Sequence, residues 1–86
     1  MVEKNVVVKN ETGLHARPAA ALVQFVKSMP AEVELVKEGK VANAKSIFSV
    51  MSLGISKGTE ITVRVHGEDE EENLDKVVDF ITNLTD

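Results

Sequence analysis

The sequence predicts an α+β fold, an open-faced two-layer sandwich in which amphipathic helices cover one face of an antiparallel sheet. Several short stretches alternate apolar and polar side chains, as half-buried strands do. Other stretches repeat apolar residues every three or four positions, as amphipathic helices do. With 86 residues the chain is long enough for one small domain, and we expect that domain to span residues 1–86.

The first two predicted elements are a strand and a helix. Residues 2–8 are rich in β-branched residues, and the alternation directs Val6 and Val8 toward the core. A helical pattern follows from residue 16 to about residue 29, and Pro30 ends it. The apolar stripe of this helix comprises Ala19, Leu22, Val23 and Val26.

The next segment is predicted to form a hairpin. Residues 32–37 alternate charged and apolar side chains, with Val33 and Leu35 on the buried side. The pair Glu38-Gly39 is a tight-turn signal, and it leads into a short strand over residues 40–43. Because the turn is so short, the two strands must be antiparallel neighbours.

A short helix and a further strand follow the hairpin. Ser46 is a good N-cap for a helix over residues 47–53, which Gly54 can terminate in a left-handed conformation. Residues 60–66 then alternate well, which predicts another half-buried strand. The residues of this strand expected to face the core are Ile61, Val63 and Val65.

The last element is predicted to be an amphipathic helix. Asp69 is expected to cap it, with Glu72 three residues later completing a capping box. Its apolar stripe comprises Leu74, Val77, Val78, Ile81 and Leu84. The predicted order is strand, helix, strand, strand, short helix, strand, helix. This order does not fix the order of strands in the sheet, because a ferredoxin-like arrangement fits the same elements.

The composition argues against several classes of function. The net charge is -4 and aromatic residues make up only 3% of the chain, whereas nucleic-acid surfaces need a basic stripe or aromatic stacking platforms. The absence of cysteine excludes disulfides, thiolate catalysis and cysteine–zinc sites. The two histidines lack metal-ligand spacing, so we expect no metal site and no other cofactor.

The sequence also carries no signal for a membrane or for a nucleotide. Residues 1–5 have no basic stretch followed by an apolar one, and no apolar run approaches the length that crosses a membrane. We therefore expect a cytoplasmic protein without membrane insertion. The stretch Lys57-Gly58-Thr59 does not fit the glycine-rich phosphate loop of nucleotide-binding proteins.

His15 is the candidate catalytic residue, because it falls at the N-cap of the first predicted helix. The amides of Ala16 and Arg17 are free donors there, since the first amides of a helix have no partner within it and Pro18 has no N–H at all. The helix dipole and the Arg17 guanidinium both favour an anion beside the ring. We expect a neutral, nucleophilic imidazole that can accept a phosphoryl group. On the spacing of these residues alone, the simpler interpretation is a solvent-exposed histidine that begins a helix and has no further role.

Two longer stretches point to a known family. Gly13-Leu14-His15-Ala16-Arg17-Pro18-Ala19 resembles the active-site signature of HPr, the histidine-containing phosphocarrier of the bacterial sugar phosphotransferase system. Lys45-Ser46-Ile47-Phe48-Ser49-Val50-Met51-Ser52-Leu53-Gly54 is similar to the regulatory-serine region of the same family. The resemblance covers essentially the whole chain. It implies a four-stranded antiparallel sheet of order 1-4-2-3, covered on one face by two long helices and one short helix.

The resemblance also implies the activity of a phosphoryl carrier, which is a relay intermediate rather than an enzyme. Nδ1 of His15 would accept a phosphoryl group from enzyme I, which draws it from phosphoenolpyruvate, and would donate it to an enzyme IIA domain. The amides of Ala16 and Arg17 would cradle that group, and the Arg17 side chain would act as a charge clamp. A relay protein that must expose His15 is best served as a monomer.

The second stretch has a structural and a functional interpretation. An N-cap serine needs no further reason to be present, yet in Gram-positive members of the family the serine that Ser46 matches is phosphorylated by an ATP-dependent HPr kinase/phosphorylase. Phosphorylation there would hinder enzyme I and favour a catabolite-control transcription regulator. Ile47, Phe48 and Met51 would pack in the core by default, but so short a helix cannot bury them all, and we expect a docking patch beside His15.

Two alternatives remain open. A regulatory HPr-like module of the Crh type would act through Ser46 and a transcription regulator without carrying phosphate, but that class has lost the active histidine, whereas His15 is present. A small-ligand-binding α+β regulatory domain is the second alternative. It would need a pocket that the sequence does not reveal.

Overall fold

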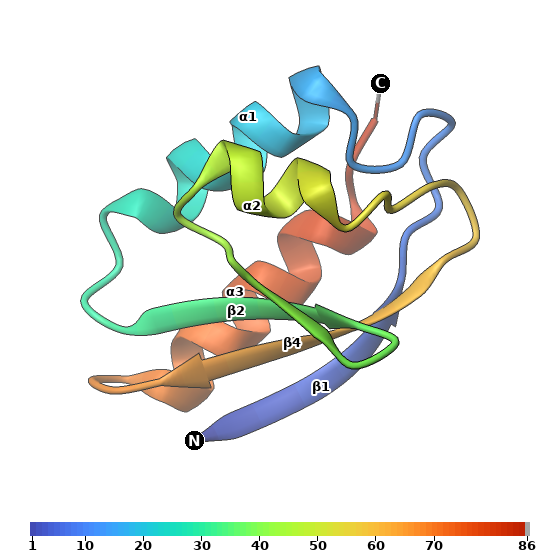
Figure 1. The fold of residues 1–86 in the computed structure, drawn as a ribbon. Coiled ribbons are helices and arrows are strands. Elements are labelled where there is room, and N and C mark those ends of the chain that lie inside the picture. Colours follow the sequence, from blue (N-terminus) through green and yellow to red (C-terminus); the bar gives the residue numbers. More distant parts are fainter. Residues whose placement is uncertain (86) are drawn as a thin grey trace.

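The chain alternates strands and helices in the predicted order (Figure 1). The structure is a computed structural model, and it describes residues 1–85. The elements are β1 (Val2–Val7), α1 (Ala16–Lys27), β2 (Glu32–Lys37), β3 (Lys40–Asn43), α2 (Ile47–Ser52), β4 (Glu60–His66) and α3 (Glu70–Thr82).

The strands form one antiparallel sheet in the order β1-β4-β2-β3. This order is the one that the family resemblance implies, and it excludes the ferredoxin-like alternative. The predicted hairpin joins β2 to β3. Glu38 and Gly39 have φ angles of 49° and 82°, so both central residues of the turn are left-handed, as a type I′ hairpin turn requires.

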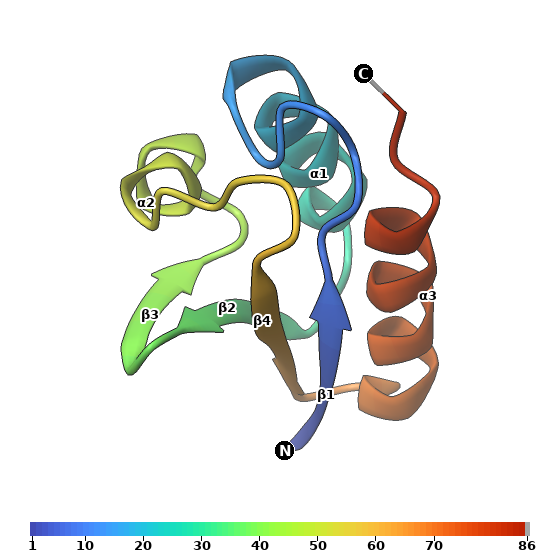
Figure 2. The ribbon, with the colours of Figure 1, turned by 90° about the vertical axis from the view of Figure 1, so that its right-hand side faces the viewer.

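The helices lie on one side of the sheet, and its other face is open (Figures 1 and 2). Packing of α3 on β1 and β4, of α2 on β3, and of α1 on both other helices encloses the core. The strand residues that the alternation predicts to face the core are buried, and these are Val6, Val33, Leu35, Ile61, Val63 and Val65. Ala42 in β3 is buried as well. The fully buried residues of the two long helices include Ala19, Leu22, Val26, Val77 and Ile81. The rings of Phe25 and Phe80 stack with their centroids 4.4 Å apart, which joins α1 to α3.

The open face of the sheet carries a polar cluster on β1, β4 and β2, although Val7 and Val41 are also exposed. Arg64 in β4 lies between two acidic neighbours, with Nε 3.2 Å from Oε1 of Glu3 in β1 and Nη1 3.6 Å from Oε1 of Glu34 in β2. The Thr62 hydroxyl donates to Oδ1 of Asn5 at 2.7 Å across the same pair of strands. These cross-strand pairs leave the sheet without an apolar outer surface at its centre.

Three element boundaries differ from the sequence prediction by one or two residues. Val8 is buried as predicted but lies beyond β1, where it exchanges hydrogen bonds with the turn before β4: its amide donates to the Thr59 carbonyl, and the Gly58 amide donates to the Val8 carbonyl. The helix α1 ends at Lys27 rather than near Met29, because the residue before a proline is biased away from helical angles. The helix α2 ends one residue early, with Leu53 as its C-cap.

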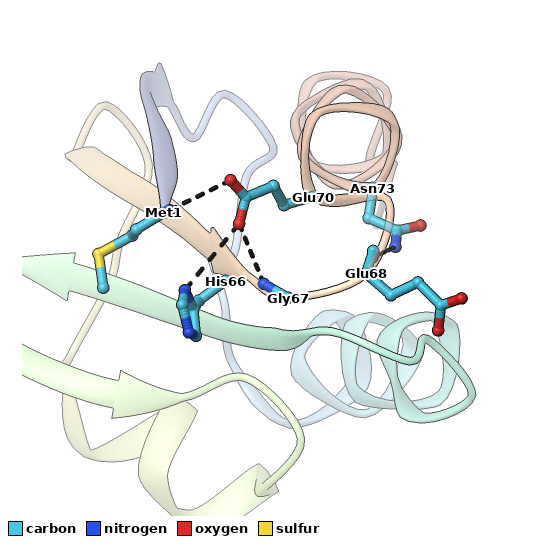
Figure 3. Close-up of polar contacts among 6 residues, drawn as sticks. All are labelled: Met1, His66, Gly67, Glu68, Glu70 and Asn73. Atoms are coloured by element: carbon cyan, nitrogen blue, oxygen red, sulfur yellow. Dashed lines mark hydrogen bonds and ion pairs between the residues drawn. The ribbon is translucent and has the colours of Figure 1, made fainter.

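The predicted capping box of α3 is wrong. Asp69 is the N-cap, but its backbone is left-handed with φ 54° and its side chain makes no capping hydrogen bond, because an N-cap side chain acts from an extended backbone. Glu72 instead lies 3.7 Å from Lys76 within the helix. The turn before α3 is held instead by the carboxylate of Glu70, which accepts a hydrogen bond from the Gly67 amide at 3.0 Å (Figure 3).

Candidate functional site

His15 lies at the N-cap of α1, as predicted, and it is exposed. Its backbone is extended, with φ -75° and ψ -172°, and its carbonyl accepts the Ala19 amide at 2.8 Å as the first hydrogen bond of the helix. The imidazole makes no capping hydrogen bond. Within residues 1–85 the imidazole has no other hydrogen-bond or ion-pair partner, so both ring nitrogens are available to a partner that approaches from solvent.

The loop before His15 is held rigidly on both sides. Nδ2 of Asn10 donates to the Gly13 carbonyl at 2.7 Å, and the amide of Gly13 donates back to the Asn10 carbonyl at 3.0 Å. The next residue, Leu14, is buried, and its amide donates to the Ile55 carbonyl at 3.0 Å. Because these bonds fix the two residues before His15, they also fix where the helix begins.

Gly13 is at its position for a steric reason. Its φ is +62°, which disfavours any residue with a Cβ. A Cβ built on Gly13 would lie 2.4 Å from the Ile55 carbonyl oxygen and 2.6 Å from Cα of Ser56. Only glycine lets these two backbone segments approach so closely.

The anion-binding groups that the sequence predicts lie at the same helix start. Ala16 and Arg17 are exposed, and Pro18 is buried, so the proline anchors the first turn in the core while its neighbours face solvent. Within residues 1–85 the Arg17 guanidinium makes no ion pair. First-turn amides that have no partner within the helix, the positive end of the helix dipole and a guanidinium without an ion pair in residues 1–85 together suit a dianionic ligand beside His15.

Ser46 is the N-cap of α2, as predicted. Its backbone is extended, and its Oγ accepts the Ser49 amide at 3.4 Å, a long hydrogen bond. The Nζ of its neighbour Lys45 donates to the carbonyl of Met29, just beyond the end of α1, at 2.8 Å. Ser46 is half-buried.

The three residues predicted as a docking patch have different surroundings. Phe48 is 85% exposed and Met51 is 43% exposed, although both side chains are large and apolar. Ile47 is half-buried and packs against the core. The exposed part of the patch therefore consists of Phe48 and Met51, and we call this pair the α2 patch.

The structure does not bring His15 and Ser46 together. The helices α1 and α2 pack against each other and run in opposite directions (Figure 1). The bond from Leu14 to Ile55 places His15 at the C-terminal end of α2, whereas the bond from Lys45 to Met29 places Ser46 at the C-terminal end of α1.

One residue near the site was not anticipated from the sequence. Nζ of Lys37, at the end of β2, donates to the carbonyls of Leu53 and Gly54, both at 3.0 Å. The sequence carries no signal for this contact, because the partners lie 16 and 17 residues away and in another element. The contact joins the hairpin to the segment that follows α2.

Within residues 1–85, no helix is long and apolar enough to span a lipid bilayer. No group of three or more His, Asp or Glu side chains in the same range is arranged to hold a metal ion.

Comparison with known families identifies the class of protein. The family described as the PTS HPr component phosphorylation site matches residues 2–83. The fold and the family match together define a protein of the HPr phosphocarrier class. The chain belongs to the HPr family.

Individual relatives fall on both branches of this family. The HPr-like protein Crh of Bacillus subtilis is 48% identical over 81 residues, which cover 94% of this chain and 95% of Crh. The phosphocarrier protein HPr of Buchnera aphidicola subsp. Baizongia pistaciae is 37% identical over 84 residues, which cover 98% of this chain and 99% of that protein.

Solved structures of HPr and of Crh share the fold of this chain. The crystal structure of HPr from Thermoanaerobacter tengcongensis superposes with a TM-score of 0.91 at 44% identity, covering 95% of this chain and 92% of that one. A crystal structure of Bacillus subtilis Crh, described as a dimer with a swapped domain, superposes with a TM-score of 0.77 at 48% identity, covering 95% and 94%.

Proposed function

We propose that this protein is a phosphoryl carrier of a sugar phosphotransferase system. Nδ1 of His15 accepts a phosphoryl group from the phosphohistidine of enzyme I and donates it to a histidine of an enzyme IIA domain. The observation that carries this proposal is an exposed imidazole at the N-cap of α1, with no hydrogen bond of its own to the helix end. The protein is a covalent relay intermediate and not an enzyme with turnover of its own.

The transfer step follows from the groups at the helix start. The lone pair of Nδ1 forms the new N–P bond as the N–P bond of the donor breaks, and the electron pair of the broken bond returns to the donor imidazole. Nδ1 is the ring nitrogen nearer its own backbone, so the phosphoryl oxygens meet the Ala16 and Arg17 amides. The Arg17 guanidinium adds a charged, two-pronged donor. A carrier needs only modest stabilisation here, because a tightly held phosphoryl group would not be passed on.

A second function is favoured by a specific observation, the 48% identity to Crh. In this function Ser46 is phosphorylated by an HPr kinase/phosphorylase that uses ATP. The Ser46 Oγ forms a bond to the γ-phosphorus of ATP as the bond from that phosphorus to the bridging oxygen breaks. The hydroxyl proton passes to a base of the kinase, and ADP leaves. The phosphate adds about -1.5 to -2 charge at the start of α2, which opposes docking of enzyme I and favours a catabolite-control transcription regulator. The presence of His15 distinguishes the carrier from a purely regulatory module.

The remaining features of the proposal concern docking and assembly. Partners contact the surface formed by His15 and the α2 patch, and Ile47 packs between this surface and the core. We propose that the protein works as a monomer of one domain, because a relay protein must present His15 to two partners in turn. The relay operates in the cytoplasm, where phosphoenolpyruvate and ATP are available.

A mass measurement tests the carrier function. The protein is incubated with enzyme I and phosphoenolpyruvate, and its intact mass is followed before and after acid treatment. We expect one phosphoryl adduct that acid removes, absent in His15→Ala. The matched control is His66→Ala, because His66 is the other histidine of the chain and is also exposed. Retention of the acid-labile adduct by His15→Ala would place the nucleophile elsewhere.

The regulatory function has its own test. Incubation with HPr kinase/phosphorylase and ATP should give an acid-stable adduct that is absent in Ser46→Ala and present in Ser49→Ala. Ser49 is the matched control because it is the next serine along the chain and lies in α2, the helix that Ser46 caps. An unmodified native chain in the presence of active kinase would refute the role of Ser46. Sedimentation at working concentration then decides between the monomer and a Crh-like dimer.

A further inference from the structure

Lys37 connects the sheet to the C-terminal end of α2. It is the last residue of β2 and is half-buried. Its ammonium donates two hydrogen bonds, to the Leu53 carbonyl at 3.0 Å and to the Gly54 carbonyl at 3.0 Å. Leu53 is the C-cap of α2, and Gly54 follows it with φ +63°. The ammonium therefore lies where the helix ends and the chain turns.

The end of α2 needs such a partner. A helix of six residues is too short to be stable by itself, and the carbonyls at its C-terminus carry partial negative charge. The last turn of α2 contains no basic residue of its own. Lys37 supplies the positive charge from another element, and hydrogen bonds with a charged donor are about twice as strong as neutral ones.

The segment that Lys37 holds leads directly to His15. Residue 55 follows the two carbonyls that the ammonium binds, and its own carbonyl accepts the Leu14 amide at 3.0 Å. Gly13 packs on the backbone of the same segment, with no room for a Cβ. A continuous set of contacts thus runs from Lys37, through residues 53–56, to the residue before His15.

We propose that Lys37 is a positioning residue that sets the place of His15 relative to the α2 patch. This inference rests on the proposed carrier function, since a partner that receives the phosphoryl group has to contact both features at once. One end of residues 53–56 continues the helix that carries Phe48 and Met51, and the other end anchors Leu14. Lys37 fixes this segment to the sheet, so it holds both features in one arrangement.

The test compares three variants. Lys37→Met keeps an unbranched side chain that is one atom shorter, because it lacks Nζ, and so it removes both hydrogen bonds. Lys40→Met is the matched control, because it removes the same charge from the same hairpin, and within residues 1–85 the Lys40 ammonium has no hydrogen-bond or ion-pair partner. Lys37→Arg keeps the charge and two donors.

The first measurement is the rate of His15 phosphorylation by enzyme I as a function of carrier concentration. In Lys37→Met the partner must restore the arrangement on docking, so we expect KM to rise about three- to tenfold, with kcat changing less than KM. Lys40→Met should stay within about twofold of the parent, since any general charge effect is common to both variants. Lys37→Arg should recover most of the loss.

The second measurement is amide hydrogen exchange, which does not depend on phosphorylation. In Lys37→Met the Leu14 amide should exchange about tenfold faster, whereas the Val63 amide in the central strand β4 should report only global opening and change less. Equal acceleration of Leu14 and Val63 would mean a general loss of stability and would overturn the proposal, as would equal KM values for Lys37→Met and Lys40→Met. If the parent protein takes up no phosphoryl group, the carrier function fails, and the Leu14 exchange still decides whether Lys37 orders this segment.

Discussion

Replacing Gly13 by alanine tests how closely the loop before His15 is fitted to its neighbour. The substitution has two costs. A residue with a Cβ at φ +62° is disfavoured by about 1–2 kcal/mol. The Cβ would also lie 2.4 Å from the Ile55 carbonyl oxygen, and a backbone atom cannot rotate away as a side chain can.

The second cost is that of an overpacked site, about 1–3 kcal/mol. Together the two costs give about 2–5 kcal/mol of lost stability, a large share of the roughly 4–13 kcal/mol expected for a chain of this length. The control is Gly39→Ala in the hairpin. Gly39 has φ +82°, but no atom lies within 4 Å of its built Cβ, so it carries the first cost alone.

The assay is urea unfolding followed by far-ultraviolet circular dichroism, because the chain has no tryptophan or tyrosine to provide fluorescence. We expect the midpoint of Gly13→Ala to fall well below that of Gly39→Ala, with the slope m unchanged in both. Failure of Gly13→Ala to fold, with Gly39→Ala folded, has the same meaning. Equal midpoints for the two variants would refute the claim that the loop is sterically constrained.

Three further predictions concern stability. Leu22→Ala, at a fully buried position of α1, should cost about 2–5 kcal/mol in the same urea assay, and a cost below 1 kcal/mol would contradict the packed core. Ser46→Ala should cost only about 0.5 kcal/mol, since its capping bond is long, and a larger loss would show a stronger cap than the structure has. The Gly67 amide, and then the ammonium of Met1, lower the pKa of Glu70 below its usual 4.5 (Figure 3). The ionised Glu70 carboxylate therefore stabilises the fold above about pH 4.5, and this contribution is lost as the pH falls through the folded-state pKa. Because Glu70→Gln lacks this contribution at every pH, its free energy of unfolding should fall less than that of the parent between pH 7 and pH 3. Equal losses would show that Glu70 has no such role.

The features that the sequence predicted well are local ones. The alternation of apolar and polar residues predicted which strand residues are buried, because successive side chains on a strand point to opposite faces. The pair Glu38-Gly39 predicted the hairpin, because few residues accept two successive left-handed positions. The N-cap position of His15 was predicted for the same kind of reason, since Pro18 can occupy only the first turn of a helix.

The features that could not be predicted depend on residues far apart in the sequence. The start of α3 looked like a capping box, yet Glu70 is held by the Gly67 amide and by the N-terminal ammonium, 69 residues away. The contact of Lys37 with the end of α2 exists only once the hairpin and the helix are packed together. The same limit applies to the site, since the separation of His15 and Ser46 follows from the opposite directions of α1 and α2.

The antiparallel packing of α1 and α2 sets how two phosphates on this protein would influence each other. Ser46 and the end of α2 beside His15 are separated by about seven residues of helix, on the order of 10 Å along the axis. This separation is comparable with the screening length of about 8 Å at physiological salt, so repulsion through solvent is largely damped. A phosphate at one of these positions then affects the other only through a partner that contacts both His15 and Ser46. A partner that contacts only one of the two residues would bind with the same affinity whether or not the other is phosphorylated.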